Sequence, residues 1–408
     1  MSSPRIAPLE QYAHVPVLAL ISLCLMLQSL STDMYTASFP GLANAFSVSA
    51  ATVQLTLSTF VIGYGIAQFI MGPLSDRFGR RPVLHCGLAA YALASLVCTF
   101  APSMAVLVAA RFFQALGCSA VIIIGRATIR DAYATEHAMQ ITARASTWLS
   151  FTPILSPILG AYLEAFFGWK GSFAFHSCFS LVLLLVVFFR LPETNRYKDP
   201  DATDVRGLIR NYRHVMASRE FWAYAILGAL SYGAIFAFIS GISMVLINVL
   251  KMPVTWFGYC FAFGTCGFLL GTIFCRQMLR RLGIGRTLRF SSRFFIFFGT
   301  VFIVLVFSGL WHWSILVAVM FITMFQHGIH SPMSHAGVIT PFPEQAGTAA
   351  GLSGVLAMLA ALFVGTIVGM TYNGTLYPIA VITFANSLML FVCARIFPEL
   401  RAPRVAAS

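Results

Sequence analysis

Twelve runs of mainly apolar residues, each close to the length needed to cross a lipid bilayer, dominate the sequence. A membrane-spanning helix needs about 20 such residues. The runs cover residues 15–39, 52–72, 82–101, 104–127, 141–165, 171–190, 221–247, 254–275, 288–308, 312–336, 346–371 and 375–396. Only 10% of the 408 residues are charged, whereas soluble domains carry about 25%. The chain is therefore predicted to be an all-α membrane protein with twelve spanning helices.

A polar interval at residues 191–220 divides the twelve runs into two groups of six. The sequence therefore predicts an N-terminal six-helix bundle at 1–190, a cytoplasmic linker at 191–219 and a C-terminal six-helix bundle at 220–408. The first apolar run has no small-residue cleavage site, so we expect it to be a retained helix rather than a signal peptide.

Positive charges mark one side of the predicted membrane protein. With the N-terminus placed inside, the loops on that side carry nearly all the arginines, whereas the opposite side receives only Lys170 and Lys251. Cytoplasmic loops of membrane proteins carry the excess of Lys and Arg. Both termini and the linker are therefore predicted to be cytoplasmic. The net charge of +13 reflects this topology, and no nucleic-acid partner is expected.

The residue patterns typical of enzymes and metal sites are not found in the sequence. All nine cysteines fall inside apolar runs and no CxxC pair occurs, so neither a disulfide framework nor a zinc site is predicted. We also find no nucleophile–base pair and no phosphate-binding loop. We therefore expect no enzyme activity, no bound metal and no cofactor.

Two opposite charges lie at similar depth in the predicted membrane region. Asp33 is about six residues from the outer end of its helix and Arg111 about seven or eight, which is roughly 9 Å and 11–12 Å deep at 1.5 Å per residue. Ionisable groups at such depth are costly and usually functional. We expect the two side chains to pair, directly or through water and Gln114. Asp33 then either exchanges protons or belongs to a structural ion pair that locks helix 1 to helix 4.

The short stretch from Gly72 to Pro82, between the second and third runs, carries one acid, three arginines and two glycines. We expect its two glycines to allow a backbone reversal. Asp131 can pair with Arg80 across the loop, and Asp76 can accept hydrogen bonds from the free N–H groups that begin helix 11. The stretch would then act as a latch between the two bundles. The predicted latch residues are Gly72, Asp76, Gly79, Arg80, Arg130, Asp131 and Gly347.

Helix 5 contains Pro153 and Pro157, four residues apart, and Gly160. The prolines remove backbone hydrogen bonds and kink a helix, and small residues allow close helix packing. The same helix carries Glu164 near its outer end, which we expect to be solvated. Taken alone, the proline pair is also compatible with an ordinary kink.

Polar and aromatic residues at mid-depth are candidates for a binding cavity. His327 and His330 lie three residues apart on one helix face, but no acid or third ligand on that helix supports a metal site, so they are expected to line a cavity or to be packed histidines. The predicted substrate-binding residues are Tyr35, Tyr64, Gln114, Trp148, Phe236, His327 and His330.

The stretch from Gly72 to Pro82 resembles the signature loop between helices 2 and 3 of the major facilitator superfamily. Further segments are similar to the Bcr/CflA group of bacterial drug exporters, the bicyclomycin and chloramphenicol resistance type. These segments are Ser31–Tyr35, Val53–Ser58, Ala110–Gly117, Arg126–Asp131 and Pro341–Ala349. The resemblance covers nearly the whole chain.

This resemblance implies two six-helix bundles related by a pseudo-two-fold axis along the membrane normal, with substrate bound between them. It also implies proton-driven export of small, mostly apolar drugs across the bacterial inner membrane by a monomer, with Asp33 and Arg111 handling protons and substrate. The proline run of helix 5 is similar to the antiporter motif, although Ser156 and Ala161 replace its usual glycines. A proton symporter that imports a metabolite and a receptor without transport activity are the alternatives.

Overall fold

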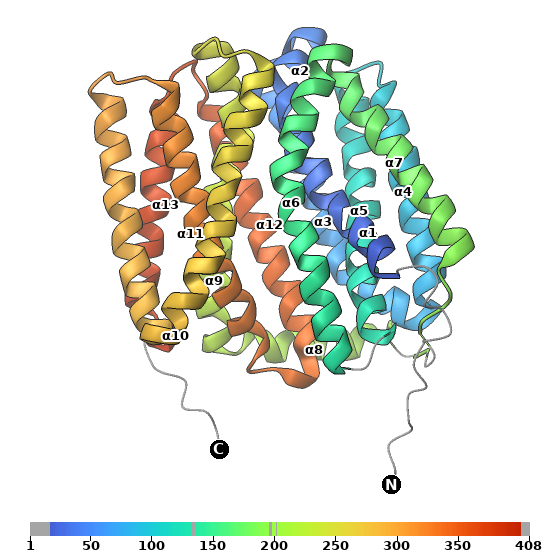
Figure 1. Cartoon of the computed structure of the whole chain (residues 1–408). Coiled ribbons are helices and arrows are strands. Elements are labelled where there is room, and N and C mark those ends of the chain that lie inside the picture. Colours follow the sequence, from blue (N-terminus) through green and yellow to red (C-terminus); the bar gives the residue numbers. More distant parts are fainter. Residues whose placement is uncertain (1–16, 133–134, 196–197, 201, 401–408) are drawn as a thin grey trace.

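The computed structural model describes residues 17–132, 135–195, 198–200 and 202–400. The side chains of residues 17–19, 130, 132, 135–150, 205 and 344 lie outside this description. Within the described residues every regular element is a helix (Figure 1). This agrees with the all-α membrane protein predicted from the apolar runs.

The first half of the chain forms seven α-helices and one short 3₁₀ segment. They are α1 (Val17–Asp33), η2 (Met34–Ser38), α2 (Phe39–Phe46), α3 (Ala50–Phe78), α4 (Arg80–Thr99), α5 (Met104–Ala132), α6 (Thr135–Phe167) and α7 (Trp169–Arg190). The second half contains α8 (Val205–Met216), α9 (Arg219–Ser243), the π-helical η3 (Met244–Val249), α10 (Val254–Phe307), α11 (Trp313–Ile339), η4 (Pro343–Gln345), α12 (Ala346–Thr371), α13 (Tyr377–Ile396) and η5 (Pro398–Leu400).

Nine helices in the described part of the chain are long and apolar enough to cross a membrane. One of them, α10, turns at Gly283, whose φ of 71° is not helical, so it supplies two crossings. The segment α1–η2–α2 and the helix α6 complete the twelve predicted crossings. The two separate helices predicted at 254–275 and 288–308 are thus joined by a short, almost continuous helical turn.

The helices pack as two sets. In the first, α5 lies between α3 and α4, α1 packs on α6, and α4 packs on α7. In the second, α9 packs on α11 and α12, and α10 packs on α11 and α13. Small residues permit these close approaches: a Cβ on Gly117 of α5 would lie 2.6 Å from the Gly87 carbonyl oxygen of α4. The sets meet where α3 packs on α12 and α6 on α10 (Figure 1).

We call the side of the molecule where α1 begins the terminal side and the opposite side the distal side (Figure 1). On the distal side the sets are in contact: a Cβ on Gly258 of α10 would lie 2.7 Å from the Cβ of Ala161 in α6. On the terminal side Arg126 of α5 and His335 of α11 are exposed, and a Cβ on Gly347 would meet no atom within 4 Å. Within the described residues, no packing like that of α6 on α10 joins α5 to α11. The structure is therefore closed on the distal side and open on the terminal side.

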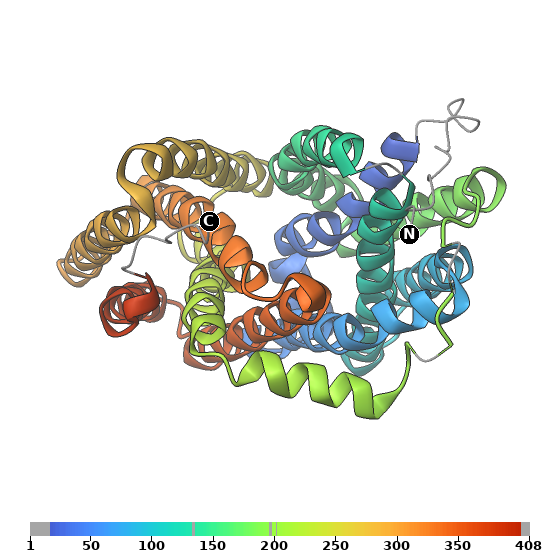
Figure 2. The same cartoon turned by 90° about the horizontal axis from the view of Figure 1, so that it is seen from below.

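The predicted linker contains a helix that the sequence analysis missed. Helix α8 begins at the N-cap Asp204, whose carboxylate accepts hydrogen bonds from the N–H groups of Arg206 (3.3 Å) and Gly207 (2.8 Å). Viewed from the terminal side, α8 runs along the edge of the molecule (Figure 2). Its Val215 is buried against the helices above it. The boundaries predicted for the two bundles stay predictions.

Candidate functional site

Arg111 of α5 is the centre of a buried polar network in the first set of helices. Its side chain is 0% exposed. Nη2 donates to the carbonyl oxygen of Ser31 (3.0 Å), Nη1 to Oε1 of Gln114 (2.5 Å) and Nε to the carbonyl oxygen of Thr56 (3.4 Å). Gln114 is itself held, because its Nε2 donates to Oγ of Ser95 at 2.7 Å. The guanidinium thus joins α1, α3, α4 and α5.

Aromatic rings surround the same guanidinium. Its central carbon lies 4.3 Å from the ring centre of Phe60, 4.6 Å from that of Tyr35 and 5.8 Å from that of Phe173. Stacked rings attract a cation, more strongly where water is excluded. No carboxylate of the described residues comes within ion-pair distance of Arg111. The direct form of the predicted pair between Arg111 and Asp33 is therefore not formed in this conformation, because carbonyl oxygens, an amide and aromatic rings occupy the contacts of the guanidinium. The pair mediated by water and Gln114 stays a prediction.

Asp33 lies at a break in the first membrane crossing. The α-helix ends at this residue and a 3₁₀ segment follows. Arg111 holds the Ser31 carbonyl just before the break, and the Tyr35 hydroxyl shares a 2.5 Å hydrogen bond with Thr56 Oγ1 just after it. The side chain of Asp33 is 8% exposed, and its Oδ1 accepts a 2.9 Å hydrogen bond from Thr32. Tyr232 of α9 lies close enough to Asp33 for an electrostatic interaction. The η2 segment that follows Asp33 also contacts α9 and α10 of the second set.

Helix α6 touches both this break and the second set of helices. A Cβ on Gly160 would overlap with the carbonyl oxygen of Met34, the first residue after Asp33 in η2. One turn earlier in α6, the carbonyl oxygen of Pro157 lies close to Gly258 of α10. A Cβ added to Gly258 would be 2.9 Å from that oxygen. The run predicted to be an antiporter motif thus lies between the carboxylate-bearing crossing and the contact of the two sets.

Several predicted substrate-binding residues are buried in internal contacts. Tyr35 and Gln114 hold Arg111, and Phe236 packs against Gly365 of α12 and the ring of Tyr232. All three side chains are at most 1% exposed, so none of them is accessible to a ligand in this conformation. The side chain of Trp148 lies outside the described residues.

The two histidines predicted to share a face have different neighbours. His327 Nδ1 shares a 3.0 Å hydrogen bond with Ser231 of α9, and its ring lies 6.0 Å from that of Tyr232. His330 is buried, and its Nε2 shares a 3.0 Å hydrogen bond with Ser291 of α10. Of the two, only His327 is partly accessible. Among the described residues no group of three metal-ligating side chains occurs.

Five further residues were not assigned to the site from the sequence: Gln28, Arg126, Glu164, Tyr232 and His335. Tyr64, a residue of the predicted site, donates a 3.0 Å hydrogen bond to Gln28 Oε1. In the sequence, nothing distinguished Gln28 and Tyr232 from the other polar and aromatic residues of the apolar runs. Arg126 interacts electrostatically with His335 across the open terminal side. Glu164 was expected to be solvated, but it is half-buried: a Cβ on Gly41 of α2 would overlap with its carboxylate. The sequence does not show which face of each helix is turned toward its neighbours, and these residues could be found only from that orientation.

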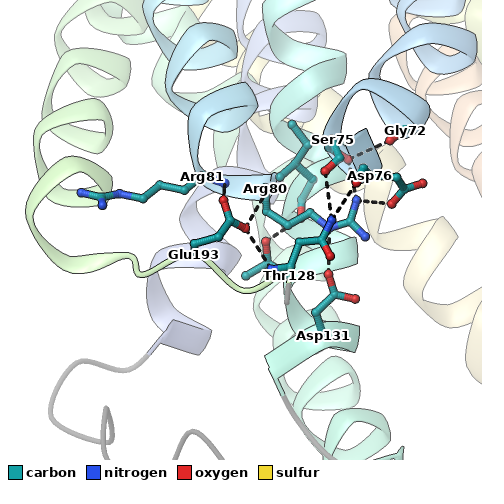
Figure 3. A network of polar contacts seen from close by, with 10 residues as sticks. Gly72, Ser75, Asp76, Arg80, Arg81, Thr128, Asp131 and Glu193 are labelled. Carbon is teal, nitrogen blue, oxygen red and sulfur yellow. Dashed lines mark hydrogen bonds and ion pairs between the residues drawn. The ribbon is translucent and has the colours of Figure 1, made fainter. Parts of the chain in front are cut away.

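The predicted latch region is a compact ionic cluster in the first set (Figure 3). Arg80 Nη1 lies 2.5 Å from Oδ1 of Asp76, and its Nε lies 2.7 Å from Oδ2 of Asp131. Nη1 also donates to Ser75 Oγ at 2.6 Å. Glu193, which was not predicted, accepts hydrogen bonds from the backbone N–H groups of Arg80 (2.9 Å) and Arg81 (3.2 Å). These N–H groups begin α4 and have no partner within the helix.

Parts of the latch prediction are corrected by the structure. Helix α3 continues through Gly72 to Phe78, so only Gly79, with a φ of 108°, reverses the chain. Asp76 pairs with Arg80, and no described hydrogen bond joins it to the start of α12 at Gly347. The side chain of Arg130 lies outside the described residues. A contact between Asp76 and α12 stays a prediction for a conformation closed on the terminal side.

Known proteins resemble this chain over most of its length. A family model described as Major Facilitator Superfamily matches residues 21–366. A bicyclomycin resistance protein homolog of Haemophilus influenzae is 27% identical, covering 91% of this chain and 93% of that protein. A chloramphenicol resistance protein of Pseudomonas aeruginosa is 34% identical over 56% of this chain and 54% of that protein. A bacterial homolog of the human lysosomal transporter Spinster, solved inward-facing and unoccupied, superposes with a TM-score of 0.72 at 16% identity and covers 95% of this chain and 98% of its own.

The twelve membrane crossings, their packing as two sets and the extent of the family match agree with one another. The chain is a multi-pass membrane transporter rather than an enzyme, and it belongs to the major facilitator superfamily.

Proposed function

We propose that this protein is a proton-driven antiporter that exports small, mostly apolar drugs or toxic metabolites from the cytoplasm. The observation that carries the proposal is the position of Asp33. Its carboxylate is nearly buried, lies at a helix break between the two sets and has no cation within ion-pair distance among the described residues. An unpaired buried carboxylate is costly when ionised, so binding a proton there releases free energy. The resistance proteins that the chain resembles support a drug as the cargo.

The proposed cycle is alternating access, in which the two sets tilt about the site between them. In the present conformation the terminal side is open, so a substrate enters from that side and a proton leaves Asp33 toward it. After the sets tilt, a proton from the distal side neutralises Asp33 and the substrate departs. Arg111 does not neutralise Asp33 directly in this scheme. It fixes the backbone around the break, so that the carboxylate keeps its place while the sets move.

The orientation follows from the charges. We place the terminal side, with both termini and the linker helix α8, in the cytoplasm of a bacterium, and the protein in its inner membrane. The bundles are proposed to extend over residues 1–190 and 220–408, and the protein is proposed to act as a monomer. Protons and the membrane potential supply the energy, without a cofactor.

The replacement Asp33→Asn tests the proposal. We expect it to abolish proton-coupled efflux while the protein still inserts, because the amide keeps the size of the side chain but cannot exchange a proton. Efflux of diverse antimicrobials is measured in cells with verified expression, and proton release on drug addition in inverted membrane vesicles. Asp204→Asn is the matched control, since Asn is as good an N-cap as Asp for α8.

Three results would contradict the proposal. Normal proton-coupled efflux by Asp33→Asn would place proton exchange at another residue. Substrate movement in the same direction as the proton, measured by counterflow in inverted vesicles, would make the protein a symporter. A chain without any ligand-dependent proton flux would be a receptor.

A further inference from the structure

Three arginines form a basic surface on helix α8, outside the site between the two sets. Arg206, Arg210 and Arg213, together with Ile209, line a shallow pocket of about 320 Å³. The arginines are four and three residues apart, so they share one face of the helix. All three are exposed to solvent.

The charge on this face is not balanced within the described part of the chain. Helix α8 contains no acidic residue, and its N-cap carboxylate at Asp204 is used by two backbone N–H groups. None of the three arginines forms an ion pair with a described carboxylate. Like charges three and four residues apart repel one another. The face therefore favours a ligand with negative charge.

The neighbouring flank of α8 is apolar and exposed. Ile209 is 52% exposed and Met216 is 39% exposed, and their spacing of seven residues puts them on the same side of the helix. The next stripe of the helix is fixed to the protein: the ring of Tyr212 lies 5.2 Å from that of Phe69 in α3, and Val215 is buried. Exposed apolar residues beside a basic face are typical of helices that lie in a membrane interface.

The place of α8 in the molecule suits such an interface. It runs along the outer edge of the terminal side, next to the ends of the membrane-crossing helices α3 and α12 (Figures 1 and 2). It also touches both sets, since Tyr212 contacts Phe69 in the first and His214 contacts Phe342 in the second. A ligand on α8 would therefore bind where the two sets are connected.

We propose that α8 binds anionic phospholipids of the membrane leaflet on the terminal side. The phosphate groups contact Arg206, Arg210 and Arg213, because guanidinium groups bind phosphate oxygens with paired hydrogen bonds. Ile209 and Met216 enter the boundary with the acyl chains. Basic clusters on amphipathic helices bind anionic leaflets in this manner.

Binding of short-chain phosphatidylglycerol to the purified full-length protein, measured by native mass spectrometry, tests this assignment. Phosphatidylcholine is the neutral comparison. The triple variant R206Q/R210Q/R213Q is expected to weaken phosphatidylglycerol binding on the order of a hundredfold. The variant R206K/R210K/R213K is expected to retain most of the binding, because it keeps the charge.

The matched control is R276Q/R280Q/R281Q, which removes three exposed arginines from the terminal side of α10. It is expected to leave the binding to α8 unchanged, and circular dichroism checks that both triple variants keep their helices. Three results would overturn the proposal: equal phosphatidylglycerol affinity in both glutamine variants, equal binding of phosphatidylcholine to the wild type, or displacement of the lipid by glycerol phosphate at a similar concentration. The last result would identify a site for soluble phosphates. The binding measurement does not depend on the direction of transport.

Discussion

The guanidinium of Arg111 carries its charge inside the protein, and none of the described carboxylates lies within ion-pair distance of it. Removing a cation from water is costly. Here the stacked rings of Phe60 and Tyr35 and two backbone carbonyl oxygens replace the water. A guanidinium suits this environment because it is planar, weakly hydrated and rich in donors. The residue therefore fixes the backbone just before the helix break at which Asp33 lies.

Arg111→Lys tests whether the positive charge of Arg111 is sufficient or whether the planar guanidinium group is also required. An ammonium keeps the charge, but it cannot serve Ser31, Gln114 and Thr56 at once or stack between two rings. We expect loss of efflux and a decrease in stability of about 3 kcal/mol, the lower end of the cost of disrupting a buried charged network. Thermal unfolding in detergent and drug efflux measure the two effects. Arg276→Lys, at an exposed position of α10, is the control and should change neither efflux nor stability. Near-normal efflux by Arg111→Lys would mean that a positive charge at this position is sufficient for transport.

At the scale of elements, the sequence predicted the membrane crossings well and their irregularities poorly. Apolar length decides whether a helix spans the membrane, so all twelve crossings could be found. The continuation of α3 through Gly72 and Pro73 was missed, because local contacts such as the 2.9 Å hydrogen bond from the Ser75 hydroxyl to the Gly72 carbonyl oxygen outweigh the turn preference of these residues. Helix α8 was missed because the high charge of the linker does not by itself indicate a helix, whereas the spacing of Leu208, Ile209, Tyr212 and Val215 does.

The site was predictable only where charge or a motif marked a residue. Asp33, Arg111 and the partnership of Arg80 with Asp131 follow from charges in an apolar sequence. The direction in which Asp33 points, and the burial of Tyr35 and Phe236, depend on how helices rotate against one another. A single sequence with apolar residues on every side of each helix does not reveal that rotation. For the same reason Tyr232 and Gln28 were overlooked.

Gly160→Ala tests the contact between α6 and the break at Asp33. The added methyl group would overlap with the Met34 carbonyl, so α6 or η2 must shift, and overpacking of this kind costs about 1–3 kcal/mol. We expect reduced efflux and a lower unfolding temperature. The same substitution at Gly125 of α5 is the control, because its Cβ would meet Ile21 at an ordinary 3.5 Å. If both variants unfold and transport alike, the contact between Gly160 and Met34 has no role in transport.

At the scale of the whole molecule, the contacts between the two sets are unevenly distributed. Gly258 lets α10 approach α6 closely on the distal side, whereas Arg126 and His335 are exposed on the terminal side and close enough to interact electrostatically. Two positive groups in this position would repel when His335 is protonated, which favours the open arrangement. Closure of the terminal side therefore needs attractive contacts beyond those that the described residues make in this conformation.

Asp76 is our candidate for such a contact, and Asp76→Asn tests it. Its carboxylate, half-exposed beside Arg80, can approach the positively polarised N-terminus of α12, an interaction worth about 1 kcal/mol. Losing it should shift the ratio of open to closed molecules about fivefold toward the open form, since 1.4 kcal/mol corresponds to tenfold. Spin labels at the exposed Phe189 of α7 and Leu282 of α10, in a background without Cys86 and Cys178, report that ratio as a distance distribution. Asp131→Asn is the control, because it also weakens the Arg80 cluster but lies on α5 rather than at the end of α3. Should Asp76→Asn and Asp131→Asn give the same distribution as the wild type, Asp76 does not hold the terminal side closed.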